Sequence, residues 1–339
     1  MKKHIDKLNT NIINYDKYSS KLERESQKFF EYRDQWDKAS NFEIETKFPT
    51  QIEFELSNAC NYRCVFCPYS FKKENMPTNF DIEKKDKILN FELFKKIIDE
   101  GSKNNLMAIE LGYNTEPLMY KKLVDAVEYA KKKGVIDIRM TSNGSKFTKD
   151  ISKKLIAAGL THLGISLDAF TKETYLKMRS SKLYEQVKQN ILDFINIRNE
   201  MGLNLPTVRV SFLETADNKH EMKDFINFWE NKVDYVTIQQ LIQYEKTPEQ
   251  LKSNNNKDEI VYNCHQPWQR VTIRSNGDIK PCCAVPGMAF NYPNVNDISI
   301  YNFWNGKIMK KLRNQLKDGE GYKNEICKAC IESVSNKNS

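Results

Sequence analysis

QIEFELSNACNYRCVFCPYS, residues 51–70, joins a β-rich run to three cysteines, Cys60, Cys64 and Cys67, that lie inside eight residues. Three thiols are an awkward number, because a structural zinc site takes four protein ligands and a disulfide framework takes an even count. Thiolates are also the usual ligands of iron–sulfur clusters. The spacing therefore favours a four-iron cluster with one iron left open, and a zinc site completed by a distant ligand is the alternative.

Short β-rich runs alternate with amphipathic helical segments from residue 50 to about 245. We expect strands at 51–57, 106–112, 135–142, 162–168, 207–213 and 234–241. Six β–α units with right-handed crossovers predict an α/β fold with a parallel sheet. Six strands are too few for an eight-stranded barrel, which leaves a partial barrel or an open sheet. In both, ligands bind at the carboxyl ends of the strands, where the cysteine loop falls.

Three regions divide the chain. Residues 1–48 form a mostly helical extension in which Phe29, Tyr32 and Trp36 make an apolar stripe. Residues 49–245 form the β/α region, and residues 246–339 begin with a polar linker at 245–259 and carry the other five cysteines.

The bulk composition excludes some classes of protein. The chain has 339 residues, 40% of them hydrophobic, and a net charge of +8. No apolar run approaches the roughly 20 residues of a membrane span, and the N-terminus has no signal-peptide pattern. We expect a cytoplasmic protein with reduced cysteines and no membrane partner. The basic residues form no arginine-rich stripe, which argues against nucleic acid as a partner.

The loop CNYRCVFC resembles the C-x3-C-x2-C loop of the radical S-adenosylmethionine superfamily. Weaker similarities follow in the family's order, in GYNTEP (112–117), TSNGS (141–145) and ISLDAFTKETYLKMR (165–179). GYNTEP lacks the paired glycines of the family's Gly-Gly-Glu-Pro turn, and each segment alone is also ordinary turn or cap chemistry. The resemblance implies a set of cofactor-binding residues, namely Phe66, Glu116, Asn143, Ser166, Asp168 and Arg179.

The same resemblance implies the chemistry of the first site. Cys60, Cys64 and Cys67 would hold a [4Fe–4S] cluster whose open iron binds S-adenosylmethionine. An electron from a reductant such as flavodoxin or ferredoxin would then cleave the cofactor to a 5′-deoxyadenosyl radical that takes hydrogen from a C–H bond. The protein would orient the substrate and exclude water.

A second cysteine group lies near the C-terminus. RVTIRSNGDIKP (270–281) is a β-hairpin pattern with an Asn-Gly turn, which would bring Cys264 and Cys282 together. With its Gly-x4-Cys step from Gly277 and the pair Cys327 and Cys330, the region resembles the SPASM/twitch subfamily. The resemblance implies a partial (β/α)6 barrel followed by a small twitch-type domain with one auxiliary [4Fe–4S] cluster. Zinc is the alternative, because C-x2-C pairs also serve zinc.

Cys283 is left over, because the Gly-x4-Cys step assigns the ligand role to Cys282. A free cysteine usually behaves as a small buried hydrophobe. The alternative is a catalytic thiol that returns a hydrogen atom to a substrate radical, as some radical epimerases of this subfamily are understood to do.

Our leading hypothesis is a radical oxidoreductase of the dehydrogenase type, acting on a small polar substrate such as a sugar or aminocyclitol. An epimerase that uses Cys283 and an enzyme that modifies a ribosomally made peptide or protein side chain are the alternatives. A non-catalytic iron–sulfur or zinc scaffold and a nucleic-acid-modifying radical enzyme are two further classes. Specificity depends on loops at the strand ends, which spacing does not reveal.

Overall fold

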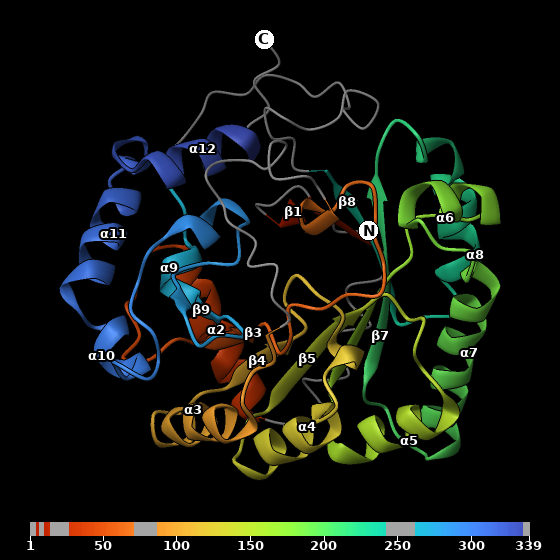
Figure 1. Cartoon of the computed structure of the whole chain (residues 1–339), viewed down its shortest axis with the longest axis horizontal. Helices are drawn as coiled ribbons and strands as arrows, with labels where there is room; N and C mark the ends of the chain where they lie inside the picture. The colour runs from red at the N-terminus through yellow and green to blue at the C-terminus, as the bar shows by residue number, and fades with distance from the viewer. Residues whose placement is uncertain (1–4, 7–9, 14–26, 71–86, 242–261, 335–339) are drawn as a thin grey trace.

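A curved sheet forms the centre of the molecule in the computed structural model, which describes residues 5–6, 10–13, 27–70, 87–241 and 262–334 (Figure 1). Its ten strands follow the order β1-β2-β8-β7-β6-β5-β4-β3-β9-β10. The central strands β3 to β8 are parallel to one another and have the bounds Gln51–Phe54, Ala108–Leu111, Asp137–Ser142, His162–Ser166, Thr207–Glu214 and Tyr235–Gln240. These are the six strands expected from the sequence, and the prediction of an α/β partial barrel is confirmed.

Helices cover the outer face of this sheet along the rim seen in Figure 1. They are α3 (Phe91–Lys103), α4 (Leu123–Lys132), α5 (Lys149–Ala158), α6 (Lys172–Arg179), α7 (Tyr184–Glu200) and α8 (Met222–Trp229). Asn90, Thr148 and Thr171 cap α3, α5 and α6 by accepting hydrogen bonds from backbone N–H groups of the first turn. Each helix therefore starts just after a strand or loop that carries a site residue.

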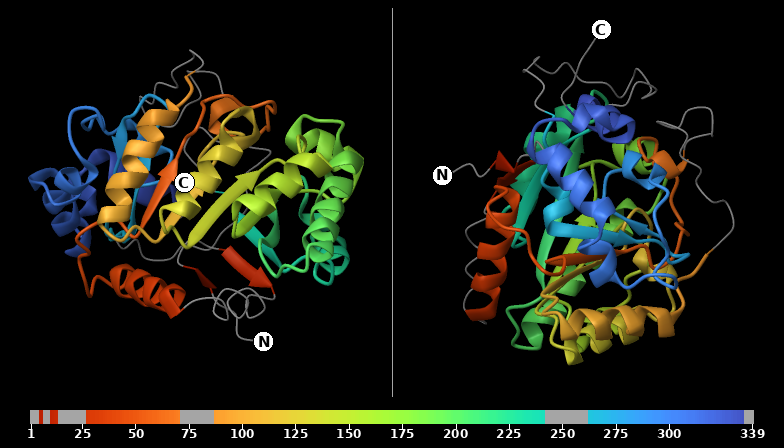
Figure 2. Two further views of the ribbon diagram at one scale, coloured as in Figure 1. Left: turned by 90° about the horizontal axis from the view of Figure 1, so that it is seen from below. Right: turned by 90° about the vertical axis from the view of Figure 1, so that its left-hand side faces the viewer.

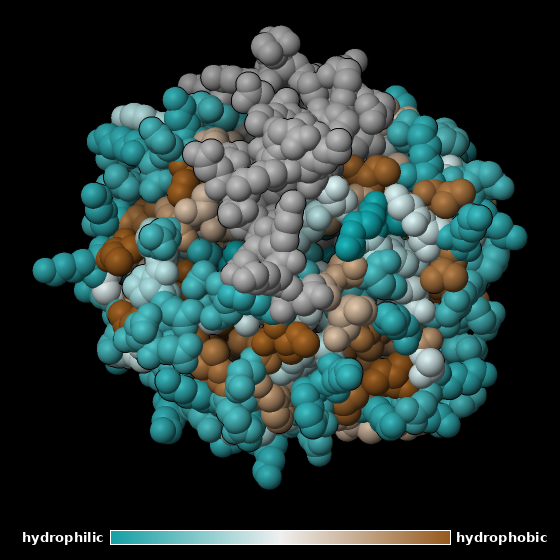
Figure 3. Space-filling model, viewed as in Figure 1, coloured by the Kyte–Doolittle hydropathy of each residue, from teal (hydrophilic) through white to brown (hydrophobic). Residues whose placement is uncertain are grey.

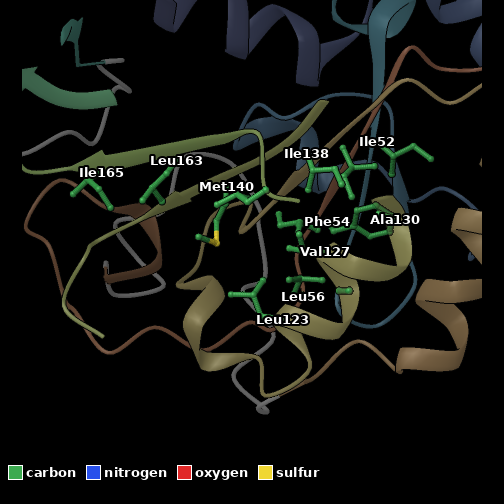
Figure 4. Packing of buried hydrophobic residues seen from close by; sticks show 14 of the residues in the cluster. Ile52, Phe54, Leu56, Leu123, Val127, Ala130, Ile138, Met140, Leu163 and Ile165 are labelled. Atoms are coloured by element: carbon green, nitrogen blue, oxygen red, sulfur yellow. The ribbon is translucent and has the colours of Figure 1, made fainter. Parts of the chain in front are cut away.

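The hydrophobic core lies between the strands and these helices. Ile52, Phe54 and Leu56 of the first strand region pack with Val127 of α4, and Ile138 of β5 joins them (Figure 4). These apolar residues occupy every second strand position, so the intervening positions face the inside of the barrel. The inner positions are polar on most strands, as in Gln51, Glu53 and Glu55.

The N-terminal region differs in part from the sequence prediction. Helix α2 (Gln27–Ser40) is present, and its buried Phe29 and Tyr32 pack with Ala108 and Tyr235, the inward-facing first residues of β4 and β8. It thus covers the end of the barrel opposite the cysteine loop (Figure 2). The expectation of a mostly helical extension was wrong for β1 (Ile5–Asp6) and β2 (Thr10–Ile13), which form a hairpin on β8. Edge strand β8 offers unpaired backbone groups, and β2 satisfies them.

The C-terminal region continues the sheet. After α9 (Gln266–Gln269), β9 (Arg270–Ile273) lies parallel to β3 and forms the expected hairpin with β10 (Ile279–Lys280). Helices α10 (Ile300–Trp304), α11 (Lys307–Lys317) and α12 (Glu325–Val334) follow. Trp268 is buried and packs edge-on against Phe42, as expected of a packing residue. The linker at 245–259 lies outside the described residues.

The surface agrees with this layering. Hydrophilic residues dominate the outer rim in the space-filling view (Figure 3). Among the described helices, none has both the length and the apolar character needed to cross a membrane.

Candidate active site and auxiliary cysteine site

The loop with Cys60, Cys64 and Cys67 begins at the carboxyl end of β3. Tight turns hold it, since the N–H of Cys67 donates to the carbonyl of Cys64 at 3.1 Å and the N–H of Tyr62 donates to Cys60 Sγ at 3.5 Å. A short 3-10 helix, η1 (Pro68–Ser70), ends the loop. The three thiols therefore face the strand ends, where a β/α fold binds its ligands.

The environment of these thiols fits a shared iron–sulfur cluster. Burial, together with the neighbouring thiols, raises the pKa of Cys67 to about 11, and burial also raises the pKa of Cys60. Such thiols need an electron-poor metal partner to stay deprotonated. In the described ranges, no three His, Cys, Asp or Glu side chains are placed to hold a single metal ion, and the described cysteines form no disulfide. The three thiols are close enough to interact electrostatically, and in a cluster each thiolate would bind a different iron.

Two predicted residues, Glu116 and Asn143, meet on one side of the loop. Buried Glu116 accepts hydrogen bonds from the N–H of Asn143 and the hydroxyl of Ser142, both at 2.8 Å. Its own N–H donates to the carbonyl of Ala59 at 3.3 Å. The Asn143 side chain donates to Asn61, inside the cysteine loop, at 2.9 Å. The ends of β4 and β5 are thus tied directly to this loop.

Phe66, Asp168 and Arg179 meet on the other side of the loop. The Arg179 guanidinium lies over the Phe66 ring, 5.2 Å from its centroid, and pairs with Asp168. One of its nitrogens donates to Cys64 Sγ at 3.5 Å. Asp168 has a positive φ of 61° and accepts from the N–H of Leu213 at 2.8 Å. Because the ion pair is buried, Arg179 donates its further hydrogen bond to the Cys64 sulfur rather than to water.

Ser166, the sixth predicted cofactor residue, ends β6 beside Ser211 of β7. It reaches the same edge of the sheet, and no hydrogen bond of its side chain occurs among the described residues. Its predicted role, like the roles of the other five, stays a prediction.

Sequence reasoning missed the polar interior of the barrel. Glu53 pairs with Arg270 at 2.5 Å, Glu110 with Arg139 at 3.4 Å and Glu55 with Arg274 at 3.4 Å. The sequence did contain evidence of this polar interior. Strands of a parallel sheet that is buried on both faces usually have continuous apolar sequences. QIEFE and AIEL alternate instead, and alternation in a strongly curved sheet places polar groups on its inner face.

The auxiliary cysteines gather where α12 meets the hairpin. Cys264 precedes α9, Cys282 follows β10, and Cys327 and Cys330 lie on α12. Burial and nearby thiols raise the pKa of Cys282 and Cys330 well above the usual range, and the pKa of Cys327 to about 12. Cys264 is close enough to interact electrostatically with the other three. Four neighbouring thiols are the number that a fully ligated cluster needs.

Gly287 is a residue of this site that the sequence did not indicate. A Cβ at this position would lie 2.4 Å from Cys282 Sγ. The absence of a side chain at Gly287 therefore provides the space that Cys282 Sγ occupies.

Cys283 lies between the auxiliary cysteines and the barrel interior. Its thiol donates to Gln266 Oε1 at 3.5 Å and is 3.9 Å from Arg270 Nη1. The Tyr113 hydroxyl donates to its carbonyl oxygen. Its side chain thus packs toward β9 and the charged inner face, and its predicted catalytic role stays untested.

Two parts of the sequence match known families. Residues 54–228 match the Radical SAM superfamily, and residues 264–331 match an iron–sulfur cluster-binding domain. GTP 3′,8-cyclase of Campylobacter jejuni subsp. doylei is 28% identical over 256 residues, which are 72% of this chain and 68% of that protein. A probable GTP 3′,8-cyclase of Saccharolobus islandicus is 27% identical over 180 residues, 53% of each chain. The chain thus spans about half the length of several curated relatives that it matches.

Solved structures share the fold at low sequence identity. BtrN in complex with AdoMet and 2-DOIA has a TM-score of 0.53 and 17% identity, over 84% of this chain and 93% of that one. Streptococcus suis SuiB bound to S-adenosylmethionine has a TM-score of 0.59 and 15% identity, over 79% of this chain and 68% of that one. At these identities the likeness concerns the fold alone.

Proposed function

Because the chain belongs to the radical SAM superfamily, we propose that it abstracts hydrogen from a small polar substrate, such as a sugar or aminocyclitol, and releases an oxidised product. Membership of this family, with the iron–sulfur cluster-binding domain, confirms [4Fe–4S] clusters and S-adenosylmethionine as the cofactors. When bound, they supply a 5′-deoxyadenosyl radical at the first site and an electron acceptor at the second.

The chain's own residues would hold these groups as follows. Cys60, Cys64 and Cys67 would bind the first cluster, and Cys264, Cys282, Cys327 and Cys330 the second. Glu116 fixes the ends of β4 and β5 around the cysteine loop, which would orient the amino acid part of the cofactor. Arg179, held by Asp168, would donate a hydrogen bond to the Cys64 sulfur. A flavodoxin or ferredoxin as reductant and a cytoplasmic location belong to the same proposal.

The proposal of an oxidised product rests on one observation, which is the contact between the auxiliary site and the barrel interior. The Thr272 hydroxyl lies 3.1 Å from the carbonyl of Cys282 and 3.2 Å from Glu53 on the inner face. A substrate inside the barrel would therefore lie one or two side chains away from the auxiliary cysteines. An oxidation needs an electron acceptor near the substrate, and this arrangement supplies one.

A radical epimerase is the second candidate, and the placement of Cys283 favours it. The thiol is not needed among the four auxiliary ligands, and it lies on the side of Arg270 and Glu53. A thiol in this place could return one hydrogen atom to a substrate radical. The product would then keep the composition of the substrate.

The two outcomes differ in a measurable way. Anaerobically reconstituted enzyme would be incubated with substrate, S-adenosylmethionine and dithionite in D2O, and the product analysed by mass spectrometry. A product that lacks two hydrogens supports the dehydrogenase, whereas a product one mass unit heavier than the substrate, with one solvent deuterium bound to carbon, supports the epimerase. Protein that binds zinc and no iron, or that never cleaves S-adenosylmethionine, would contradict both.

A further inference from the structure

The inner face of the barrel carries several arginines, and most of them contact a carboxylate. Arg270 pairs with Glu53, and Arg139 pairs with both Glu110 and Asp137. Arg209 of β7 differs. Within the described ranges it makes no ion pair and no hydrogen bond, and its Nε is fully buried without a partner.

Arg209 points into the barrel and lies close to the backbone of β6. It pairs in register with Gly164, whose missing Cβ would stand 2.7 Å from Arg209 Nη2. Any larger residue at position 164 would push the guanidinium away. Burial raises the pKa of Glu110 and of Asp168, and Arg209 is near enough to both carboxyl groups to oppose that rise, which places it between the mid-level of the barrel and the cysteine end.

A second donor without a partner lies on the neighbouring strand. The hydroxyl of Thr237 on β8 is buried and makes no hydrogen bond in the part of the chain that the structure describes. Thr237 pairs in register with Ser211, two positions beyond Arg209 on β7. Both residues alternate with apolar residues that pack outward, Val208, Val210, Val236 and Ile238, so both face the interior.

Solvent reaches this interior although α2 covers its far end. Arg139 and Glu110 keep 21% and 18% of their side chains exposed, and the Arg209 side chain is half-buried. Water therefore reaches these groups. The cysteine loop lies at the other end, so a ligand at Arg209 would lie between the barrel floor and the cofactor site.

We propose that Arg209, with Thr237, binds an oxyanion of the substrate, so that the substrate is a small acid, either a carboxylate or a phosphate ester. This inference rests on the proposed function and narrows its substrate class. It disfavours a cationic aminocyclitol, which would meet an unpaired positive charge.

Two physical arguments support an oxyanion as the missing partner. A partly buried cation that no carboxylate contacts is poorly compensated, so its retention calls for a partner that arrives from outside. The guanidinium is a planar fork that matches carboxylate and phosphate geometry with two parallel hydrogen bonds, and such charge-assisted bonds are stronger than neutral ones. The adjacent threonine hydroxyl would supply a third donor.

The test compares four hexoses that differ in a single group. Glucose, glucosamine, glucuronate and glucose 6-phosphate would be titrated calorimetrically into oxygen-free reconstituted enzyme that holds S-adenosylmethionine. The variants are Arg209→Gln, Arg209→Lys and Gly164→Ala, and Arg33→Gln on the outer helix α2 is the matched control. Thermal unfolding of each variant without sugar gives its effect on the fold.

We expect one of the two acidic sugars to bind wild-type enzyme at least about tenfold more tightly than glucose or glucosamine, and which acid binds identifies carboxylate or phosphate. Arg209→Gln should abolish this preference without lowering the melting temperature, because the residue has no partner to lose. Arg209→Lys should keep part of it, since lysine is a point charge without the fork. Gly164→Ala should fold, because a flexible side chain can move aside, and should also weaken binding of the acid. Arg33→Gln should change nothing.

Three results would overturn the proposal. They are equal binding of all four sugars by wild-type enzyme, a preference for acid that survives Arg209→Gln, or an Arg209→Gln protein that does not fold. Cleavage of S-adenosylmethionine by dithionite-reduced wild-type enzyme distinguishes failure of the Arg209 proposal from failure of the proposed function. Cleavage without acid preference rejects only the role of Arg209, whereas no cleavage and no iron rejects the proposed function itself.

Discussion

The hydroxyl of Tyr113, just past the end of β4, donates a hydrogen bond to the carbonyl of Cys283, which lies 170 residues further along the chain. Tyr113 is buried among Tyr69, Met288 and Val285, so apolar contacts reinforce this bond. It joins the cofactor end of the barrel to the segment that carries an auxiliary cysteine. The relative position of the two cysteine sites therefore depends on contacts of this kind.

Tyr113→Phe removes the hydrogen bond to the Cys283 carbonyl and should weaken the contact between the two cysteine sites with little effect on the fold. Loss of one buried hydrogen bond costs about 1 kcal/mol, and the unpaired carbonyl adds to that cost. We expect cleavage of S-adenosylmethionine to persist while less product forms per 5′-deoxyadenosine released. Tyr129→Phe is the control, because its hydroxyl bonds Asp99 at 2.8 Å on the outer helices. An unchanged ratio of product to 5′-deoxyadenosine in Tyr113→Phe would show that this hydrogen bond does not matter for turnover.

The two cysteine groups predict the iron content. Seven thiolates in two sites should give about eight irons per chain after anaerobic reconstitution. Replacing Cys60, Cys64 and Cys67 with alanine should remove about half of this iron and all cleavage of S-adenosylmethionine, as iron analysis and chromatography would measure. Replacing Cys327 and Cys330 should remove the other half and leave some cleavage.

Cys283→Ala is the matched control for those variants, because Cys283 is a half-buried cysteine beside a predicted ligand. It should keep the full iron content. A drop to half in this variant would mean that Cys283, and not Cys282, holds the auxiliary cluster.

The buried pair of Asp168 and Arg179 predicts a large effect on stability. Asp168→Asn would leave Arg179 buried without its counter-ion, and breaking a buried pair from one side typically costs about 3–5 kcal/mol. Asp217→Asn is a fitting control, since Asp217 pairs at 2.7 Å with Lys177, whose side chain is exposed, and such pairs contribute about 0–1 kcal/mol. Urea unfolding of both variants would measure the difference. Similar midpoints for the two would show that the buried pair is not structural.

His162 predicts how stability depends on pH. It is fully buried at the start of β6, between Thr207 and Tyr235, and burial with the charges of Arg139 and Arg209 holds its pKa well below the usual 6.5. The folded chain keeps the ring neutral while the unfolded chain binds a proton. This contribution to stability is therefore complete above about pH 6.5 and is lost as the pH falls, at about 1.4 kcal/mol per pH unit.

His162→Gln should remove that part of the pH dependence, as urea unfolding between about pH 7.5 and 5.5 would measure. His220→Gln is the control, because the His220 side chain is 66% exposed. If wild type and His162→Gln lose stability in parallel, His162 takes up its proton in the folded state as well.

Much of the architecture could be predicted from the sequence, because strand and helix patterns are local. The six parallel strands, the Asn-Gly hairpin and the helix with Cys327 each follow from short-range periodicity or turn chemistry. Strands β1 and β2 could not be predicted, because they form on an edge that β8 leaves open. A strand of this kind depends on its partner more than on its own residues.

Besides the cysteines, the family resemblance indicated residues that meet at the cysteine loop, such as Glu116 and Arg179, but not the charged pairs of the barrel interior. The spacing of the cysteines is a covalent property of the chain, whereas the ion pair of Glu53 and Arg270 joins residues 217 positions apart. Among the described residues, the Nε of Arg209 has no hydrogen-bond partner, and no local sequence pattern predicts this. The same holds for Gly287, whose role depends on the sulfur that packs against it.

Cys283→Ala decides between the two proposed outcomes. A thiol that returns hydrogen must reach the substrate, and the Cys283 side chain lies on the Arg270 side, with burial and Glu53 raising its pKa to about 12. It therefore stays protonated near neutral pH and keeps a hydrogen atom to give. The half-buried position equally suits an inert packing residue, for which the auxiliary cluster would take the electron. We expect the second outcome, in which Cys283→Ala retains turnover and an oxidised product. If Cys283→Ala instead cleaves S-adenosylmethionine and abstracts hydrogen but forms no product, and wild-type enzyme introduces one solvent deuterium, the thiol is the hydrogen donor and the enzyme is an epimerase.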